Sequence, residues 1–244
     1  MKKRQDKKDF MRGLRKGVPV ALGYLCVSFT FGVKAVYGGI PSWIVIIMSL
    51  TNLTSAGQFA GATLIMTQAG FVELAITTFV INIRYMLMSI ALSQKTKPET
   101  GLFQRLLAGF GITDEVFAVA ASEPGEVSAG YMHGLIFLPI IGWTGGTALG
   151  AIASQIMPVM LSSAMELGLY AMFIAIIIPP ARANKSVALV IAVAIMVQCV
   201  LQFTPVLKQI SVGFRVTIAT VIAAVIGAIV KPVPLTEEKQ EVDL

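Results

Sequence analysis

Long uncharged stretches alternate with short charged ones along the whole chain. Residues 35–72, 127–165 and 186–207 contain no Lys, Arg, Asp or Glu. A helix that crosses the hydrocarbon layer of a membrane needs roughly 20 apolar residues, and each of these stretches is at least that long. The pattern therefore predicts an all-α polytopic membrane protein.

Charged residues, Pro and Gly divide this apolar sequence into eight blocks. They lie at about 17–36, 41–66, 70–93, 104–122, 128–152, 157–180, 186–205 and 212–230. A basic head, residues 1–16, holds eight of the 19 Lys and Arg residues and is expected on the cytoplasmic side of the membrane. The acidic tail, residues 231–244, is expected to be flexible.

The second block, 41–66, is expected to enter the membrane and return as two half-helices. Its centre, SLTNLTSAGQFAG (49–61), is rich in Asn, Ser, Thr and Gly and is unsuited to a continuous lipid-facing helix. With this hairpin, three basic residues of the following loop, Lys95, Lys97 and Arg105, fall inside. Glu123 and Glu126 then fall outside.

Block 157–180 is expected to behave in the same way as block 41–66. Arg182, Lys185 and Lys231 then also lie on the cytoplasmic side of the membrane. Lys208 and Arg215 remain on the less favourable outer side, so the fit to the charge rule is imperfect.

A weak internal similarity suggests that the chain contains two repeats, 17–122 and 128–230. PVALGYLCVSFTFG (19–32) is similar to PIIGWTGGTALG (139–150), and the prolines that open the next blocks, Pro41 and Pro158, lie 117 positions apart. With about three crossings and one broken element in each half, the repeats would be inverted, as in many secondary transporters. The alternative is that Pro and Gly simply recur between membrane helices.

The third block carries an arginine in the middle of FVINIRYMLMS, residues 79–89. A charge at the centre of a membrane costs roughly 2.5–3.5 kcal/mol on insertion scales, so Arg84 needs a partner. Glu73 shares its helix face but lies about 16 Å away by helix rise, which is too far. Asp114 and Glu115, in GITDEVFA (111–118), are the candidate partners.

Asp114 and Glu115 are expected to begin a half-helix that Thr113 caps, because carboxylates are favourable at a helix N-terminus. One of them would pair with Arg84, and the other would be free to carry a proton. The alternative places both acids in the headgroup region of the membrane.

Polar side chains of the broken elements are the candidate ligands for a substrate, because interrupted membrane helices present polar groups to zwitterions. In the first half these are Asn52, Ser55 and Gln58, together with Asn82 on the arginine helix. In the second half, Glu166 and Tyr170 occupy the matching element, whereas Arg84 aligns with Leu201. The alternative role for small and polar residues is plain helix packing.

The sequence argues against an enzyme and against a cofactor or metal site. His133 is the single histidine, Cys26 and Cys199 lack metal-ligand spacing, and there is no nucleotide-binding glycine loop or HExxH motif. Asp114 and Glu115 are adjacent, so on a helix they point about 100° apart and make a poor proton-sharing dyad. The net charge of +6 reflects membrane orientation rather than nucleic-acid binding.

Four motifs together resemble the AzlC-type branched-chain amino acid permeases over about residues 12–230. They are SAGQFAG (55–61), NIRYMLMS (82–89), ITDEVFA (112–118) and PIIGWTGGTALG (139–150). The resemblance implies export of leucine, isoleucine, valine and their analogues across a bacterial cytoplasmic membrane. It also implies a small AzlD-type membrane subunit as partner.

The site assignments rest on the residues themselves and not on the resemblance. The predicted substrate-binding residues are Asn52, Ser55, Gln58, Asn82, Arg84, Glu166 and Tyr170, and the predicted ion-coupling residues are Asp114 and Glu115. Arg84 would act as a carboxylate clamp or as a structural counter-charge. The alternative function is a non-transporting assembly or signalling subunit, in which polar residues only hold helices together.

Overall fold

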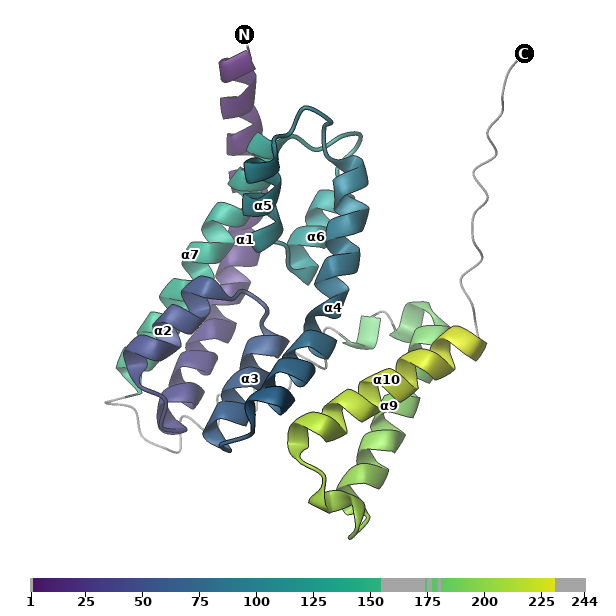
Figure 1. The fold of residues 1–244 in the computed structure, drawn as a ribbon. Helices are drawn as coiled ribbons and strands as arrows, with labels where there is room; N and C mark the ends of the chain where they lie inside the picture. The colour runs from purple at the N-terminus through teal and green to yellow at the C-terminus, as the bar shows by residue number, and fades with distance from the viewer. Residues whose placement is uncertain (1, 155–173, 175–176, 180, 231–244) are drawn as a thin grey trace, which may run out of the picture. The chain divides into compact units, whose positions relative to one another are not determined.

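A computed structural model of the chain describes residues 2–154, 174, 177–179 and 181–230. The named helices are α1 (Lys2–Tyr37), α2 (Ser42–Thr51), α3 (Ala56–Met66), α4 (Phe71–Lys95), α5 (Leu102–Phe110), α6 (Asp114–Ala121), α7 (Ala129–Ala153), α9 (Lys185–Phe203) and α10 (Val212–Val230) (Figure 1). A 3-10 helix, Leu207–Gln209, joins α9 to α10.

Five of these helices, namely α1, α4, α7, α9 and α10, are long and apolar enough to cross a membrane. The predicted all-helical, polytopic fold class is therefore confirmed. The chain divides into two compact units, residues 1–171 and 172–244, which are described separately below.

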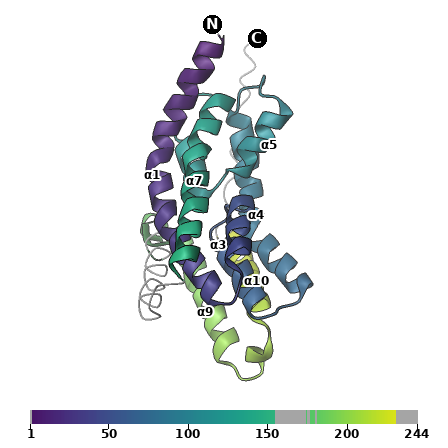
Figure 2. The same cartoon turned by 90° about the vertical axis from the view of Figure 1, so that its left-hand side faces the viewer.

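Helices α1 and α7 lie side by side and form the centre of the first unit (Figure 2). Glycines allow their backbones to touch. A Cβ on Gly134 would lie 2.0 Å from the carbonyl oxygen of Phe10, and a Cβ on Gly150 would lie 2.1 Å from that of Phe29. Because residue 10 meets 134 and residue 29 meets 150, the two helices run in the same direction.

This parallel arrangement bears on the predicted inverted repeat. The similar segments 19–32 and 139–150 lie on α1 and α7, and segments related by an inverted repeat would run in opposite directions. The structure therefore does not support the predicted inversion for this pair of segments.

Helices α2 and α3 form a hairpin of two half-helices, as predicted for block 41–66. The end of α3 returns to the end of α1, because a Cβ on Gly38 would lie 1.7 Å from Sδ of Met66. At the break, Asn52 Oδ1 accepts hydrogen bonds from the backbone nitrogen of Thr54 at 3.0 Å and from its hydroxyl at 2.6 Å. The next residue, Ser55, has a φ of 35°, which interrupts the helix.

Helices α5 and α6 form a second hairpin in block 104–122, which the sequence predicted as a crossing with a half-helix beginning at Asp114. The start of α5 lies beside the start of α7, since Gln104 O is 3.2 Å from Nε2 of His133. The end of α6 returns to the end of α4, since Lys95 Nζ donates to the carbonyl oxygen of Ala121. Block 104–122 therefore turns back on itself (Figure 1).

This second hairpin corrects the predicted location of two acidic residues. Glu123 contacts Lys16 of the basic head, so residues 122–128 lie at the end of the unit where α1 begins. We call this end the basic end: it holds the start of α1, the end of α4 and the start of α7. The prediction that Glu123 and Glu126 face the opposite side from the head was wrong.

In the second unit, α9 and α10 form an antiparallel pair. A Cβ on Gly227, near the end of α10, would lie 2.5 Å from Cγ2 of Val190, near the start of α9. These helices match the predicted blocks 186–205 and 212–230. Most of block 157–180, with Pro158, Glu166 and Tyr170, and the tail 231–244 lie outside the described residues.

Candidate functional site

Arg84, in the middle of α4, forms an ion pair with Asp114, the first residue of α6. Nη2 of Arg84 lies 3.0 Å from Oδ2 of Asp114, and the two side chains are 44% and 45% exposed. Arg84 also donates to the hydroxyl of Tyr85 at 3.2 Å. The structure thus places Arg84 against one of the two acids that the sequence indicated, in a charge-assisted pair.

Glu115 has a different partner, the phenol of Tyr24 on α1. The Tyr24 hydroxyl donates to Oε2 of Glu115 and lies 2.5 Å from Oγ1 of Thr113. Tyr24 is buried, and its ring packs edge-on against Trp143 with 5.4 Å between ring centroids. Tyr24 was missed from the sequence, because nothing in its position within α1 shows which helix it faces.

Local sequence explains why both acids stand at this place. Gly111 ends α5, and Thr113 adopts extended backbone geometry and accepts a hydrogen bond from the backbone nitrogen of Val116 at 3.3 Å. This is the predicted N-terminal cap. The first turn of α6 then holds Asp114 and Glu115 where the helix dipole favours negative charge.

Asn82, two residues before Arg84, lies against the other helix break. A Cβ on Gly57 would lie 2.3 Å from Oδ1 of Asn82 and 2.8 Å from Oγ1 of Thr54. Oδ1 of Asn82 is buried and has no hydrogen-bond partner among the described residues. Helix α4 therefore touches one break through Asn82 and the other through Arg84.

Gln58 holds three helices together. Its Nε2 donates to Ser49 on α2 at 2.6 Å, and its Oε1 accepts from Nε1 of Trp143 on α7 at 2.8 Å. Ser49 is in turn 2.7 Å from the hydroxyl of Thr147. Gln58 is only 1% exposed, so in this conformation both ends of its amide are occupied by the protein.

The predicted site residues therefore fall into two groups. Asn52, Ser55 and Asn82 surround the first break, and Arg84, Asp114 and Glu115 meet at the second. Gln58 packs behind the first break. Glu166 and Tyr170 lie outside the described residues.

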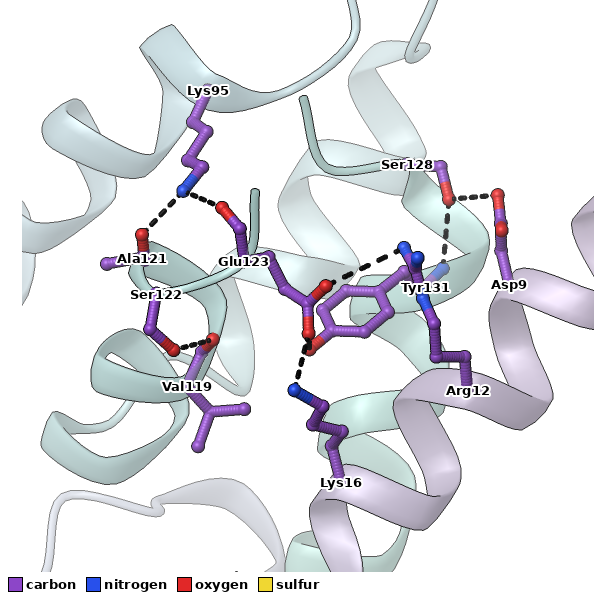
Figure 3. A network of polar contacts seen from close by, with 10 residues as sticks. All are labelled: Asp9, Arg12, Lys16, Lys95, Val119, Ala121, Ser122, Glu123, Ser128 and Tyr131. Carbon is purple, nitrogen blue, oxygen red and sulfur yellow. Dashed lines mark hydrogen bonds and ion pairs between the residues drawn. The ribbon is translucent and has the colours of Figure 1, made fainter. Parts of the chain in front are cut away.

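A second polar network lies at the basic end and was not singled out from the sequence (Figure 3). The Glu123 carboxylate is 2.9 Å from Lys16 Nζ, accepts a hydrogen bond from Tyr131 at 2.9 Å and is 3.9 Å from Arg12. The hydrogen bond from Lys16 lowers the pKa of Glu123, although burial of the carboxyl acts in the opposite direction. Lys95 donates to the backbone carbonyl of Glu123, so the network joins α1, α4 and α7.

A cavity of about 400 Å³ lies between the end of α4, α5 and the start of α7. Apolar side chains such as Leu92, Ile112 and Met132 line it, together with Ser93 and Arg105. An apolar pocket with a few polar groups is the usual form of a small-molecule site. Its size is adequate for an aliphatic amino acid.

Five long apolar helices, two interrupted half-helix pairs and an ion pair on a membrane helix define the class of this protein. It is a polytopic helical membrane protein with a polar site built on helix breaks. The chain belongs to the AzlC family: the model of the family described as "AzlC protein" matches residues 19–157. The family predicted from the four sequence motifs is therefore confirmed.

Three relatives of the chain are named as membrane proteins. The chain is 33% identical over 172 residues to an "Uncharacterized membrane protein" of Archaeoglobus fulgidus, covering 70% of this chain and 75% of that one. It is 26% identical to the "Inner membrane protein YgaZ" of Escherichia coli K12, covering 60% and 61% of the two chains. An "Uncharacterized membrane protein" of Helicobacter pylori J99 is 25% identical, covering 60% and 67%.

The chain matches no solved structure. Family membership and the five long apolar helices establish a membrane protein and are consistent with a role in transport.

Proposed function

We propose that this chain is a secondary transporter that exports branched-chain amino acids across the bacterial cytoplasmic membrane, together with a small AzlD-type membrane subunit. The observation that carries the proposal is the Arg84–Asp114 ion pair, held at 3.0 Å between α4 and the break before α6. Ionisable residues within membrane helices are costly and usually serve substrate or ion pathways. Leucine, isoleucine, valine and their analogues are the proposed substrates.

The ion pair supplies a mechanism for binding an amino acid. Both side chains are nearly half exposed, so a substrate carboxylate can replace Asp114 on the guanidinium of Arg84. A displaced Asp114 carboxylate would no longer be compensated by a cation and would take up a proton. Binding of substrate and protonation of Asp114 would then be coupled, with Glu115 as a second proton site.

Residues at the break between α2 and α3 would bind the ammonium end of the substrate. The buried Oδ1 of Asn82 has no partner among the described residues and can accept a hydrogen bond from an ammonium group. Asn52 and Ser55 lie at the same break and offer further oxygens. Apolar neighbours on α3 and α4 would select a branched aliphatic side chain.

The alternative function is a non-transporting subunit, in which polar residues only hold helices together. The hydrogen bonds of Gln58 fit that packing role. Both ends of the Gln58 amide bond to the protein, which is how a packing residue behaves. The half-exposed ion pair differs, because apolar packing would join the same helices without the cost of desolvating two charges.

The test is loss of preloaded labelled leucine from cells that express the chain with its small subunit. Efflux should be faster than in cells lacking the pair of proteins, and Arg84→Ala or Asp114→Asn should remove the gain without lowering the amount of protein in the membrane. Arg182→Ala and Glu99→Gln, which change exposed charges, should leave efflux intact. Unchanged efflux in both site variants would refute the site, and no efflux from the intact pair would refute the function.

A further inference from the structure

Arg215, in the first turn of α10, is a second arginine on a candidate membrane-crossing helix, and its environment differs from that of Arg84. Its side chain is 7% exposed, and Nη1 donates to Oε1 of Gln202 on α9. Nε is buried and has no partner among the described residues. A guanidinium has five N–H donors, and a neutral amide oxygen neither satisfies all of them nor balances the charge.

No carboxylate stands beside Arg215 in the described part of the chain. Residues 167–236 contain no Asp or Glu, so neither α9 nor α10 can supply one. Arg84, in contrast, has Asp114 at 3.0 Å. A buried charge is strongly unfavourable without a counter-charge, and the described residues supply none to Arg215, which makes Arg215 a candidate ligand-binding group.

Two further polar atoms on α9 and just before α10 are also buried and unpaired within the described residues. One is Oε1 of Gln198, which precedes Gln202 by about one helical turn on α9. The other is Oγ of Ser211, whose carbonyl oxygen accepts the backbone N–H of Arg215 at 3.1 Å. Among the described residues, the α9–α10 pair and the residue before α10 thus hold an unpaired guanidinium Nε–H, an unpaired amide oxygen and an unpaired hydroxyl.

We propose that this group of residues, Gln198, Gln202, Ser211 and Arg215, is a second carboxylate-binding site whose ligand is an α-amino acid zwitterion. Arg215 and Ser211 donate hydrogen bonds to the carboxylate, and Oε1 of Gln198 accepts one from the ammonium group. The inference rests on the proposed function and names a residue that holds the substrate carboxylate. Unlike Arg84, Arg215 binds it without first releasing an acid of the described chain.

The unpaired acceptor favours an amino acid over a simple anion. The phosphate of an anionic lipid that lacks an ammonium group, or a carboxylate of another protein, would satisfy Arg215 but would leave Gln198 Oε1 without a donor, at the cost of a buried unsatisfied group. A zwitterion satisfies both. Gln202 is exposed, so the site reaches the surface of this unit.

The experiment measures ligand binding to the purified full chain in lipid nanodiscs at neutral pH. The ligands are leucine, leucinamide, which lacks the carboxylate, and 4-methylpentanoate, which lacks the ammonium. Arg215→Gln should weaken leucine binding about tenfold to a hundredfold, as expected for a charged hydrogen-bond partner. The leucine affinity of Arg215→Lys should lie between those of the unaltered chain and Arg215→Gln, because a single ammonium replaces the planar guanidinium. Arg182→Gln, on an exposed arginine of the same unit, is the matched control.

Leucinamide separates a carboxylate contact from a structural role. Its affinity should be low in the unaltered chain and equally low in Arg215→Gln, whereas a structural defect would weaken both ligands by the same factor. A second comparison uses 4-methylpentanoate, which Gln198→Ala should leave unchanged while it weakens leucine binding.

Three results would overturn the inference. Leucine binding that is unchanged in Arg215→Gln and Arg215→Lys would refute the site and leave the proposed transporter standing. Loss of a co-purified anionic lipid from Arg215→Gln, with leucine affinity intact, would identify lipid phosphate as the ligand. Absence of leucine binding to the unaltered chain would refute this inference, whereas the proposed function is refuted only by absence of efflux from the chain with its small subunit. If Arg215→Gln does not fold, Arg215→Lys, which keeps the charge, decides the matter alone.

Discussion

Asp114 and Glu115 are neighbours in sequence but meet different parts of the protein. Successive residues on a helix point about 100° apart, so Asp114 reaches Arg84 on α4 while Glu115 reaches Tyr24 on α1. The sequence predicted one paired acid and one left over. It gave no sign that a tyrosine on the first helix holds the second acid, since that contact joins residues 91 positions apart.

The ion pair should show coupling in stability. Arg84→Gln and Asp114→Asn each leave one charge without its partner, and each should cost about 1–3 kcal/mol. The double variant removes both charges and should be more stable than the sum of the two single effects predicts. Thermal unfolding of the purified protein in detergent measures this, and strictly additive effects would show that the two side chains do not interact.

Gly57 should be essential to the first break. A Cβ there would press on the Asn82 amide at 2.3 Å and on the Thr54 hydroxyl at 2.8 Å, so Gly57→Ala should lower stability by about 1–3 kcal/mol and displace Asn82. Gly61→Ala is the matched control on the same helix, because its nearest contact would be an ordinary 3.6 Å. Equal unfolding temperatures for the two variants would contradict this packing.

At the scale of elements, the two hairpins show what pattern alone can and cannot predict. The segment from Asn52 to Ser55 is polar enough to indicate a helix break, so the α2–α3 hairpin could be predicted. Block 104–122 is apolar and of the length of one crossing, so length could not separate a single helix from two short ones. Only Gly111 and Thr113 marked the turn.

The pairing of α1 with α7 illustrates a second limit. Glycines at Gly134 and Gly150 mark a face that permits close approach, and small residues of this kind are typical of membrane helix contacts. The helix that packs on this face, α1, is more than 100 residues away in the sequence. No local pattern shows that its backbone fits against these glycines.

The Glu123 network should make stability depend on pH in the acidic range. The pKa of Glu123 in the folded protein lies below the ordinary value of about 4.3. The contribution of Glu123 to the free energy of unfolding is therefore complete above about pH 4.3. It is lost as the pH falls through the lowered pKa of the folded state. The advantage of the unaltered chain over Glu123→Gln should therefore shrink as the pH is lowered from about 6 to 3. Thermal unfolding as a function of pH measures it.

Glu126→Gln serves as the control for that series, because Glu126 is exposed in the same loop. It should follow the unaltered chain at every pH. A Glu123→Gln variant that unfolds at the temperature of the unaltered chain throughout would show that the network contributes nothing.

On the scale of the whole first unit, two long helices, α1 and α4, are each followed by a hairpin of two short helices. Helix α4 begins near the end of α1 and ends at the basic end, so α1 and α4 run in opposite directions. Each is followed by a hairpin that enters from the end at which the helix finishes. The α2–α3 and α5–α6 hairpins therefore start from opposite ends of the unit.

This arrangement predicts which loops share a side of the membrane. In a chain lacking Cys26 and Cys199, Lys97→Cys and Glu126→Cys should react from the same side with a membrane-impermeant thiol reagent. Thr67→Cys, after the α2–α3 hairpin, should react only from the other side. Labelling of residues 97 and 126 from opposite sides would restore the full crossing at 104–122 and refute the second hairpin.

The central claim is that the chain moves branched-chain amino acids by way of the Arg84–Asp114 pair. Leucine counterflow tests it most directly: proteoliposomes holding the chain and its small subunit are loaded with unlabelled leucine and diluted into labelled leucine. The account predicts transient, saturable accumulation of label that isoleucine and valine inhibit and that Arg84→Ala abolishes. Accumulation no greater than in protein-free liposomes would contradict it.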